Sequence, residues 1–451
     1  MPLINKIKEN TFMHSAYKEL YDPSTKVTPL INKNHESIPS LIQNWPYKTS
    51  SWPIIIKKEL TNQFEIISQR ISNLLNQIPS LYFKNDINEI ADYYFDSDYQ
   101  KAEQAMEFIS KDISNCQRLD LCLTKSGFKI LEVNLGASLG GSEVQYFDPI
   151  MQINHLEFFQ EKTFKLNQIQ DNFVQYLINE TKKLKPSTDT LNIFLSCEWE
   201  GDDLNKNLII DFLKSVIRKK ITNNKFNVFL DTPSLLQFEK ELKYKGHRID
   251  AVMLLYVGET LTPNIINAHK KNKIFSTDHL GLEILSNKKN LALLYRMAQK
   301  KTFRESDNKL ILNCIPWTSE LIDQKVTYQC SEINLIELMT LNKDNFVIKP
   351  GSGFSGNNIT VGKFNSNEKW NLALRKAEKE GDYIVQEFCD SLDYYTFNED
   401  NLISKFKIIW GAFAFGNTYG GVMVRMSEMK QDKGVVNGAT GALASLVYEE
   451  V

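Results

Sequence analysis

Residues 118–134, RLDLCLTKSGFKILEVN, contain two stretches in which apolar and polar residues alternate, separated by a short segment that ends in glycine. Alternation with a period of two is typical of β-strands, and a short glycine-containing turn between two such stretches predicts a β-hairpin. Side chains two positions apart share a face, so Arg118 lies beside Asp120 on one strand and Glu132 beside Asn134 on the other. Pairing of the strands then collects these four polar groups at one place.

The four polar groups suit a magnesium and phosphate site. Mg²⁺ binds carboxylate and amide oxygens together with phosphate oxygens, and a guanidinium is a good partner for a phosphoryl or acyl-phosphate group. The alternative is an amphipathic hairpin whose polar face is solvated and salt-bridged, and the hairpin alone does not decide between the two. The segment GASLGGSEVQ, residues 136–145, favours the ligand site, because backbone N–H groups in a loop of small residues can approach an anion.

The last third of the chain contains a second phosphate-binding signal. The strand-like segment NFVIKP carries Lys349 and leads into the loop GSGFSGNN at 351–358, whose N–H groups can wrap phosphate oxygens. It is not a Walker A loop, because the lysine precedes the glycines, and an ordinary glycine-rich hairpin loop is the alternative. Two weaker signals follow. YIVQEF at 383–388 is either an edge strand or the wall of a nucleotide pocket, and Arg425 after GNTYGGVMV is either a surface arginine or a phosphate ligand.

Periodicity predicts further elements. The first 50 or so residues are polar with scattered prolines and read as an irregular arm over another domain. Helices are expected at 57–78, 101–115, 204–220, 233–245 and 367–380. Strands are expected at 191–196, 226–231, 251–257, 345–350, 359–364, 383–388, 405–415 and 422–428. The alternation of strands and helices from 191 to 257 indicates a small parallel, Rossmann-like sheet, without the G-x-G-x-x-G dinucleotide motif.

Composition and charge narrow the classes of partner. The net charge of −2 and the pI of about 6.4 indicate no general attraction to nucleic acid or to an anionic membrane. The six cysteines show no C-x-x-C and no zinc spacing, and are expected as buried, reduced thiols. No stretch approaches the ~18 apolar residues of a membrane span, and the N-terminus lacks an apolar signal segment. We expect a cytoplasmic protein, and the sequence leaves the oligomeric state open, a homodimer included.

The motifs, taken in order, resemble one family. R-x-D and E-x-N are eleven residues apart; then come Ser286-Asn287-Lys288 before an apolar helix, a K-P strand with its glycine loop, a V-Q strand, and G-N-x-Y-G-G-x-x-x-R. Over residues 118–428 the chain is similar to circularly permuted ATP-grasp ligases, such as the synthetase domain of glutathionylspermidine synthase. The resemblance implies an α/β (α+β) fold with a circularly permuted ATP-grasp core and a Rossmann-like pre-ATP-grasp subdomain.

The resemblance also implies a division into three parts. Residues 1–185 would hold the N-terminal arm and the magnesium-binding part of the ATP-grasp core. Residues 186–285 would form the Rossmann-like subdomain. Residues 286–451 would form the lid with its lysine and glycine loop, together with the remainder of the core.

The activity that the resemblance implies is ligation of a carboxylate to an amine. ATP with Mg²⁺ would phosphorylate a small-molecule or peptide carboxylate, and an amine would attack the acyl phosphate to give an amide, ADP and phosphate. The implied roles are magnesium binding for Asp120, Glu132 and Asn134; catalysis for Arg118 and Arg425; ATP binding for Lys288, Lys349, Ser355, Gly356, Gln386, Glu387 and Phe388; and substrate contact for Ser138. The alternatives are acylation of a carrier thiol, direct phosphotransfer, and a catalytically silent nucleotide-binding partner protein.

Overall fold

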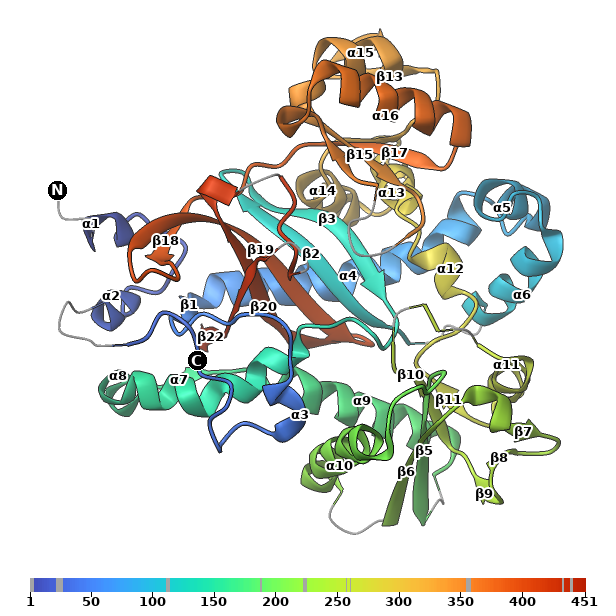
Figure 1. The fold of residues 1–451 in the computed structure, drawn as a ribbon. Helices are drawn as coiled ribbons and strands as arrows, with labels where there is room; N and C mark the ends of the chain where they lie inside the picture. Colours follow the sequence, from blue (N-terminus) through green and yellow to red (C-terminus); the bar gives the residue numbers. More distant parts are fainter. Residues whose placement is uncertain are drawn as a thin grey trace.

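The computed structural model describes residues 4–21, 27–110, 114–186, 189–221, 225–256, 258–259, 261–353, 358–431, 434–438 and 441–451. Its centre is a six-stranded antiparallel sheet in the order β21-β20-β19-β2-β3, with β18 paired to β19 (Figure 1). The strands are β2 (Cys116–Thr124), β3 (Gly127–Leu135), β18 (Tyr394–Phe397), β19 (Ile403–Phe415), β20 (Thr418–Glu428) and β21 (Leu443–Ser445).

The hairpin predicted at 118–134 is present, with the predicted faces together. Arg118 is the cross-strand partner of Asn134, and Asp120 is the partner of Glu132. The register shifts directly after Asp120, which marks a β-bulge, and a bulge bends the strand and re-aims its side chains. Strand β20 begins at 418, four residues before the predicted start, so the glycine-rich turn before it is shorter than expected.

The N-terminal segment is more than an irregular arm. It contains the short helices α1 (Ile4–Ile7), α2 (Tyr17–Leu20) and α3 (Ser40–Gln43) and the strand β1 (Ile54–Ile56). Strand β1 pairs in parallel with β22 (Val447–Glu450), which pairs with β4 (Phe164–Lys165). The apolar side chains of this segment belong to the main core of the protein: Ile7, Phe12, Met13, Tyr17, Leu20, Tyr21, Val27, Ile31, Ile38, Ile42 and Trp52.

Replacing Phe12 by alanine tests this contribution to the core. The ring is 7% exposed and lies 6.0 Å from the ring of Tyr394 and 5.7 Å from that of Trp410, between centroids. We expect the free energy of unfolding to fall by about 3 kcal/mol in chemical denaturation, because a buried aromatic ring is lost. Leu402→Ala, at a side chain that is 60% exposed, should cost less than about 0.5 kcal/mol. Equal effects of the two substitutions would argue that the segment only covers the core.

Long and short helices cover the central sheet. Helix α4 (Lys58–Leu81) crosses it and contacts β2, β19 and β20, close to the helix predicted at 57–78. Helices α5 (Ile87–Tyr94) and α6 (Tyr99–Ile109) pack against each other at one end, on the right of Figure 1. The helix predicted at 101–115 therefore ends six residues early, and residues 111–113 lie outside the described part. Helices α7 (Asp148–Asn154), α8 (Leu156–Glu161) and α9 (Ile169–Leu184) follow the hairpin.

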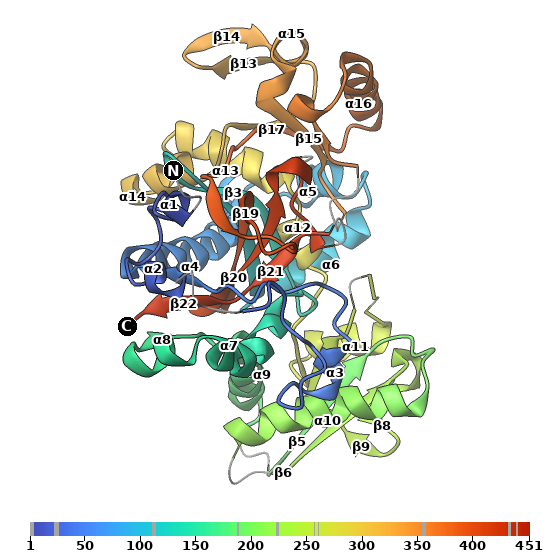
Figure 2. The ribbon, with the colours of Figure 1, turned by 60° about the vertical axis from the view of Figure 1, so that its left-hand side comes forward.

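A second, parallel sheet lies at the bottom of Figures 1 and 2. Its order is β11 (Phe275–Ser276), β10 (Ala251–Leu254), β5 (Thr190–Ser196) and β6 (Lys225–Asp231), and all its pairs are parallel. Helices α10 (Asp203–Lys220) and α11 (Pro263–Lys270) connect its strands. Three predicted strands and one predicted helix of this region are confirmed, although β10 stops at Leu254 rather than 257.

The helix predicted at 233–245 is wrong. The segment forms one 3₁₀ turn (Pro233–Leu235) and a small antiparallel sheet of β7 (Gln237–Phe238), β8 (Leu242–Tyr244) and β9 (His247–Arg248). The two residues between β8 and β9, Lys245 and Gly246, have φ of +46° and +83°. Two successive residues with positive φ make a tight hairpin turn. The apolar residues before this turn have helix-like spacing, which led to the wrong prediction.

The part that we call the lid runs from β12 to β17 (residues 318–387) and stands at the top of Figures 1 and 2. Its antiparallel sheet has the order β12 (Thr318–Glu320), β17 (Tyr383–Glu387), β15 (Phe346–Pro350) and β16 (Thr360–Val361). It also holds β13 (Lys325–Tyr328), β14 (Ser331–Asn334), α15 (Leu335–Leu341) and α16 (Asn367–Glu380), and α12 (Leu282–Leu285), α13 (Lys289–Gln299) and α14 (Glu305–Cys314) precede it. Helix α16 matches its prediction, whereas the strand predicted at 359–364 shortens to β16 and a 3₁₀ turn.

Two expectations from composition can be compared with the fold. Within the described ranges, no helix has both the length and the apolar character needed to cross a membrane. All six cysteines are described and free of disulfides; Cys116, Cys122, Cys197 and Cys314 are buried, Cys389 is half-buried and Cys330 is exposed. The expectation of buried thiols therefore fails at Cys330.

Candidate functional site

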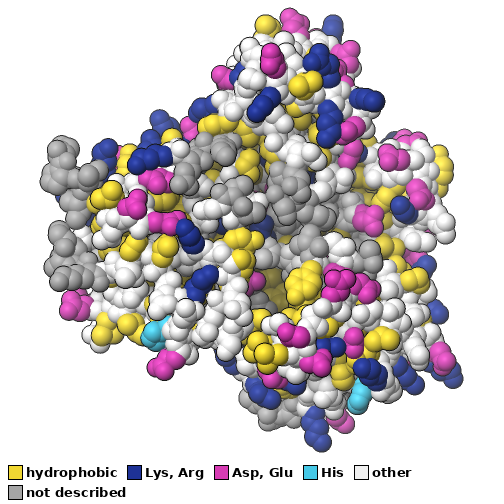
Figure 3. Space-filling model, viewed as in Figure 1, with side chains coloured by type: hydrophobic (Ala, Val, Ile, Leu, Met, Phe, Trp, Pro, Cys, Tyr) yellow, Lys and Arg dark blue, Asp and Glu magenta, His cyan; other side chains and the backbone are white. Residues whose placement is uncertain are grey.

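A cavity of about 1040 Å³ lies where the central sheet, the lid and the parallel sheet meet. Figure 3 shows the recessed face between these parts. The cavity is lined by every described residue that the sequence predicted for the site: Arg118, Asp120, Glu132, Asn134, Ser138, Lys288, Lys349, Gln386, Glu387, Phe388 and Arg425. The other two, Ser355 and Gly356, lie outside the described residues. The fold thus collects the predicted positions, while the roles assigned to them stay predictions.

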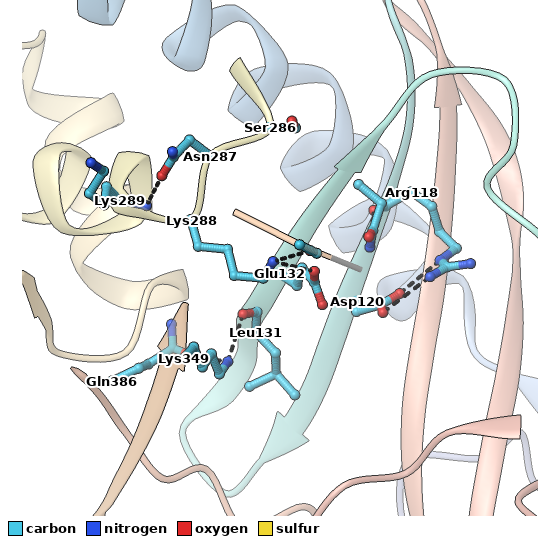
Figure 4. A network of polar contacts seen from close by, with 12 residues as sticks. Arg118, Asp120, Leu131, Glu132, Ser286, Asn287, Lys288, Lys289, Lys349 and Gln386 are labelled. Carbon is cyan, nitrogen blue, oxygen red and sulfur yellow. Dashed lines mark hydrogen bonds and ion pairs between the residues drawn. The ribbon is translucent and has the colours of Figure 1, made fainter. Parts of the chain in front are cut away.

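Asp120 is held between two arginines. Nε of Arg118 lies 2.8 Å from its Oδ1, and Nη2 of Arg425 lies 2.7 Å from its Oδ2; Figure 4 shows the contact with Arg118. Burial alone would raise the pKa of Asp120, but the two guanidinium groups outweigh it and lower the pKa to about 2. Asp120 is therefore anionic at physiological pH and fixes two cations of the cavity.

Lys288 joins the central hairpin to the base of the glycine-rich loop. Its Nζ lies 3.1 Å from Oε1 of Glu132 and donates to the carbonyl of Gly353 at 2.7 Å. Its main-chain N–H donates to the carbonyl of Gly351 at 2.8 Å. Figure 4 shows the Lys288 side chain, directly before α13, reaching toward Glu132 on β3. One lysine therefore contacts both structures that the sequence assigned to phosphate and metal binding.

Lys349, on β15, contacts the same strand, β3, one residue before Glu132. Its Nζ donates to the carbonyl of Leu131 at 2.9 Å and to Oε1 of Gln386 at 2.7 Å. Burial lowers the pKa of Lys349 to about 8; Glu132 opposes this shift, and Lys288 adds to it. The lysine is thus cationic at neutral pH but close to losing its proton.

Four cations, Arg118, Arg425, Lys288 and Lys349, surround the carboxylates of Asp120 and Glu132, so this cluster of six side chains has a net charge of +2. The rest of the described cavity lining is acidic, with seven carboxylates and two lysines. In the described part of the chain, the buried Nε–H of Arg425 has no hydrogen-bond partner. A buried donor without a partner and an unbalanced charge both cost free energy. An anionic ligand at this point would relieve both costs.

Oxygen donors for a divalent cation are present beside these cations. Asn134 uses its Nδ2 to donate to the carbonyl of Arg118 at 3.4 Å, which leaves its Oδ1 as an acceptor. Glu132 contacts Lys288 through Oε1, whereas both oxygens of Asp120 already accept from arginines. Among the described residues, no three His, Cys, Asp or Glu side chains are grouped to hold a metal. The donor set fits Mg²⁺, which takes few protein ligands and completes its shell with phosphate and water oxygens.

The loop after the hairpin is anchored from two directions. The guanidinium of Arg118 donates to the carbonyls of Leu139 and Gly140, the latter at 3.0 Å. On the other side, Oγ of Ser138 donates to the carbonyl of Leu254 at 3.1 Å, so this hydroxyl, predicted to contact substrate, also ties the loop to the parallel sheet. The N–H of Ala137 donates to Oδ1 of Asp278 at 3.2 Å. The loop therefore links the arginine site to the carboxyl edge of the parallel sheet.

The end of strand β17 forms a further wall of the cavity. The N–H of Glu387 donates to the carbonyl of Trp317 at 2.8 Å, and the N–H of Phe388 donates to that of Asn345 at 2.7 Å. These two backbone donors are thus already used within the lid. Gln386 is 1% exposed, and its amide is committed to Lys349 and to neighbouring groups of the core.

Several cavity residues were missed by sequence reasoning. Trp45 and Tyr47 come from the N-terminal segment, Asp278 and His279 follow β11, and Asp382 precedes β17. Polar residues directly after a strand of a parallel sheet lie at its carboxyl edge, where ligands commonly bind, so the pair after β11 could have been found. Burial lowers the pKa of His279 to about 3, with His269 adding to the shift, so its ring is neutral. No local pattern marks the two N-terminal aromatic residues.

The fold is similar to that of a solved structure, but the sequence identity between the two chains is low. A glutathione synthetase-like effector from Globodera pallida, in its apo form, aligns with a TM-score of 0.56 and 12% identity over 88% of this chain and 89% of that chain. D-alanyl-alanine synthetase A from Vibrio cholerae O1 biovar eltor aligns with a TM-score of 0.28 and 10% identity over 58% of this chain and 88% of that one, which is too low to indicate a shared fold. No protein-family model and no curated protein matches the chain.

Proposed function

We propose that the protein is an ATP- and Mg²⁺-dependent ligase that joins a carboxylate to an amine through an acyl phosphate. The observation that carries the proposal is the cluster around Asp120 and Glu132, where four cations, two carboxylates and one carboxamide from distant segments line the cavity and the charges of the cluster sum to +2. A nucleoside triphosphate bound with one Mg²⁺ carries about two negative charges and would balance it. The proposed fold is a circularly permuted ATP-grasp core around a Rossmann-like subdomain, divided at residues 185 and 285.

The proposed nucleotide position follows the charged groups. Lys288 and Lys349 would hold the phosphates, because both ammonium groups lie beside Glu132 at the centre of the cavity. The adenine would lie against Gln386, Glu387 and Phe388 at the end of β17. The likeness to a glutathione synthetase-like protein supports the fold on which this placement depends, but not a particular substrate.

Glu132 and Asn134 are the proposed protein ligands of Mg²⁺. Both line the cavity and use only one polar side-chain atom in the contacts described above, whereas Asp120 would have to release an arginine before it reached a metal. When bound, Mg²⁺ would neutralise phosphate charge and orient the transferring phosphoryl group. Asp120 is proposed to hold Arg118 and Arg425 in place for that group.

The chemistry needs positioning and charge stabilisation more than a nucleophilic side chain. A carboxylate oxygen of the substrate attacks the γ-phosphorus, the bond to the β–γ bridging oxygen breaks, and ADP leaves. The amine nitrogen then attacks the acyl carbon. The bond between that carbon and the phosphate oxygen breaks, phosphate leaves with the electron pair of this bond, and the nitrogen loses a proton to solvent. Arg118 and Arg425 would stabilise the charge that develops on the transferring group.

A screen for ADP release tests the proposal. Purified protein with Mg²⁺ and ATP would be incubated with pools of small carboxylic acids and peptides, each with and without pools of amines. The proposal expects ADP release that requires both an acid and an amine, together with an amide product. A stable phosphorylated product would select direct phosphotransfer, a thioester would select acylation of a carrier thiol, and ATP binding without any turnover would select a catalytically silent protein.

The depressed pKa of Lys349 predicts a pH dependence of nucleotide binding. The ammonium is lost as the pH rises through about 8, whereas an ordinary lysine stays charged to about pH 10. We expect the affinity for Mg²⁺-ATP, measured by calorimetry, to fall above pH 8 by up to about tenfold per pH unit. Lys349→Arg keeps a permanent cation and should remove the decline. Equal affinity of the wild type at pH 7 and 9 would contradict a contribution from this charge.

A further inference from the structure

Asp382, the residue directly before strand β17, connects three segments around the base of the glycine-rich loop. Its carbonyl accepts from the N–H of Gly351 at 2.7 Å, and its Oδ2 accepts from Oγ of Ser352 at 3.1 Å. Its Oδ1 lies 3.0 Å from Nζ of Lys289, the first residue of α13. Asp382 therefore ties both loop residues to the helix that follows Lys288, Gly351 through its main-chain carbonyl and Ser352 through its carboxylate.

Lys289 is itself fixed by groups outside the lid. Its side chain is 10% exposed, its Nζ donates to the carbonyl of Tyr93, and it lies 4.4 Å from the centroid of that ring. Its N–H donates to Oδ1 of Asn287 at 2.9 Å. Figure 4 shows the two neighbouring lysines leaving the chain in different directions, Lys288 toward Glu132 and Lys289 away from it. A buried cation that cannot move makes a firm anchor for a carboxylate.

Gly351, at the base of the loop, packs closely against Asp382 and Asn287. A Cβ at Gly351 would lie 2.5 Å from Oδ1 of Asp382 and 3.1 Å from Oδ1 of Asn287. The carbonyls of Gly351 and Gly353 accept from the main chain and the Nζ of Lys288, respectively. The position of Asp382 thus determines where these loop residues lie relative to the lysine that faces the cavity.

We propose that Asp382, paired with Lys289, is a positioning residue that sets Gly351–Gly353 at the right place for phosphate groups beside Lys288. This inference rests on the proposed function, since it assumes that the loop base and Lys288 meet nucleotide phosphates. The pairing also has an electrostatic effect. Asp382 lines the cavity, and an unpaired carboxylate there would repel phosphate, whereas Lys289 cancels its charge.

The test compares nucleotide affinity across a double-mutant cycle. Asp382→Asn keeps the size of the side chain but removes the charged link to Lys289. It should weaken Mg²⁺-ATP binding by about tenfold and raise the KM for ATP by a similar factor. The kcat at saturating ATP should stay within about twofold, because the groups at the reacting atoms are unchanged. Lys289→Met should weaken binding more, because it leaves the carboxylate unpaired. The double variant should bind better than Lys289→Met alone.

Glu380→Gln is the matched control. It removes the same charge two residues away, where Glu380 contacts Tyr383 and Lys376 rather than the loop, and should leave ATP affinity unchanged. Ser352→Ala, at an exposed side chain, should give a smaller loss than Asp382→Asn and serves if Lys289→Met does not fold. Wild-type protein that binds no Mg²⁺-ATP would refute the proposed function. If the wild type binds Mg²⁺-ATP, and Asp382→Asn and Ser352→Ala both bind it with the same affinity as the wild type, the inference is wrong while the proposed function stands.

Discussion

Glu132→Gln should reduce acid- and amine-dependent ADP release by about 10³-fold. The substitution keeps the size of the side chain but removes the charge that faces Lys288 at 3.1 Å and that lies opposite Asp120 across the hairpin. A neutral amide is a weaker Mg²⁺ ligand than the carboxylate it replaces and leaves the ammonium of Lys288 without its counter-charge. ADP release with the acid and amine found in the screen measures the loss, and the melting temperature shows whether the fold is retained.

Glu428→Gln provides the comparison for Glu132→Gln. Glu428 lies on β20 of the same sheet and is not among the residues that line the cavity, so this variant should release ADP at the wild-type rate. If Glu132→Gln also kept near-normal ADP release, the assignment of this carboxylate to the metal would be wrong.

Arg118→Met should reduce ADP release by about 10²- to 10³-fold, the loss seen when one donor to a developing negative charge is removed. The guanidinium holds Asp120 through two nitrogens and the loop carbonyl of Gly140 at 3.0 Å. Its loss removes a cation from the site of phosphoryl transfer and frees the loop that links to the parallel sheet. Affinity for Mg²⁺-ATP should change by no more than about threefold, because both phosphate-binding lysines remain.

Two further arginine variants make the second experiment specific. Arg375→Met, at an exposed residue of α16, should have no effect on ADP release. Arg425→Met should resemble Arg118→Met, because it removes the other partner of Asp120. A variant at Arg118 that lost ATP binding and ADP release to the same extent would instead assign this arginine to the nucleotide.

The parts of the fold that the sequence predicted are those that depend on local pattern. The hairpin carries a period of two and its own turn, so its register, with Asp120 opposite Glu132, follows from about 17 residues. Helix α16 was bounded by Ser366, whose Oγ accepts from the N–H of Lys369, and by Gly381 with φ +74°. Both boundary signals are written in the residues themselves.

The misplaced elements have a common physical origin. The apolar spacing at 233–245 resembles a helix, but the turn at Lys245 and Gly246 imposes a hairpin. At the N-terminus, residues such as Phe12 are buried by strands almost 400 positions away, and no local period marks that burial. Tertiary contacts decide the structure of both segments.

The candidate site divides in the same way. Residues that carry charge at characteristic spacing, such as Arg118 and Lys349, were identified before the structure. Asp382 was not, because its partners Lys289 and Ser352 become neighbours only when the lid is folded. Charged residues that face the cavity could be identified from sequence motifs. Charged residues that connect those motifs to each other could be identified only from the fold.

Neighbouring strands of the central sheet are far apart in the sequence, and this has a consequence for folding during synthesis. Strands β2 and β3 leave the ribosome early, but their neighbour β19 begins at residue 403, about 270 residues after β3 ends. At about 5–20 residues per second, the hairpin waits roughly a quarter of a minute to a minute for its partner. During that interval, the edge of β2 that will later pair with β19 is an unpaired strand edge, which invites association with other chains. The nascent protein is therefore expected to depend on chaperones until β19 has been made.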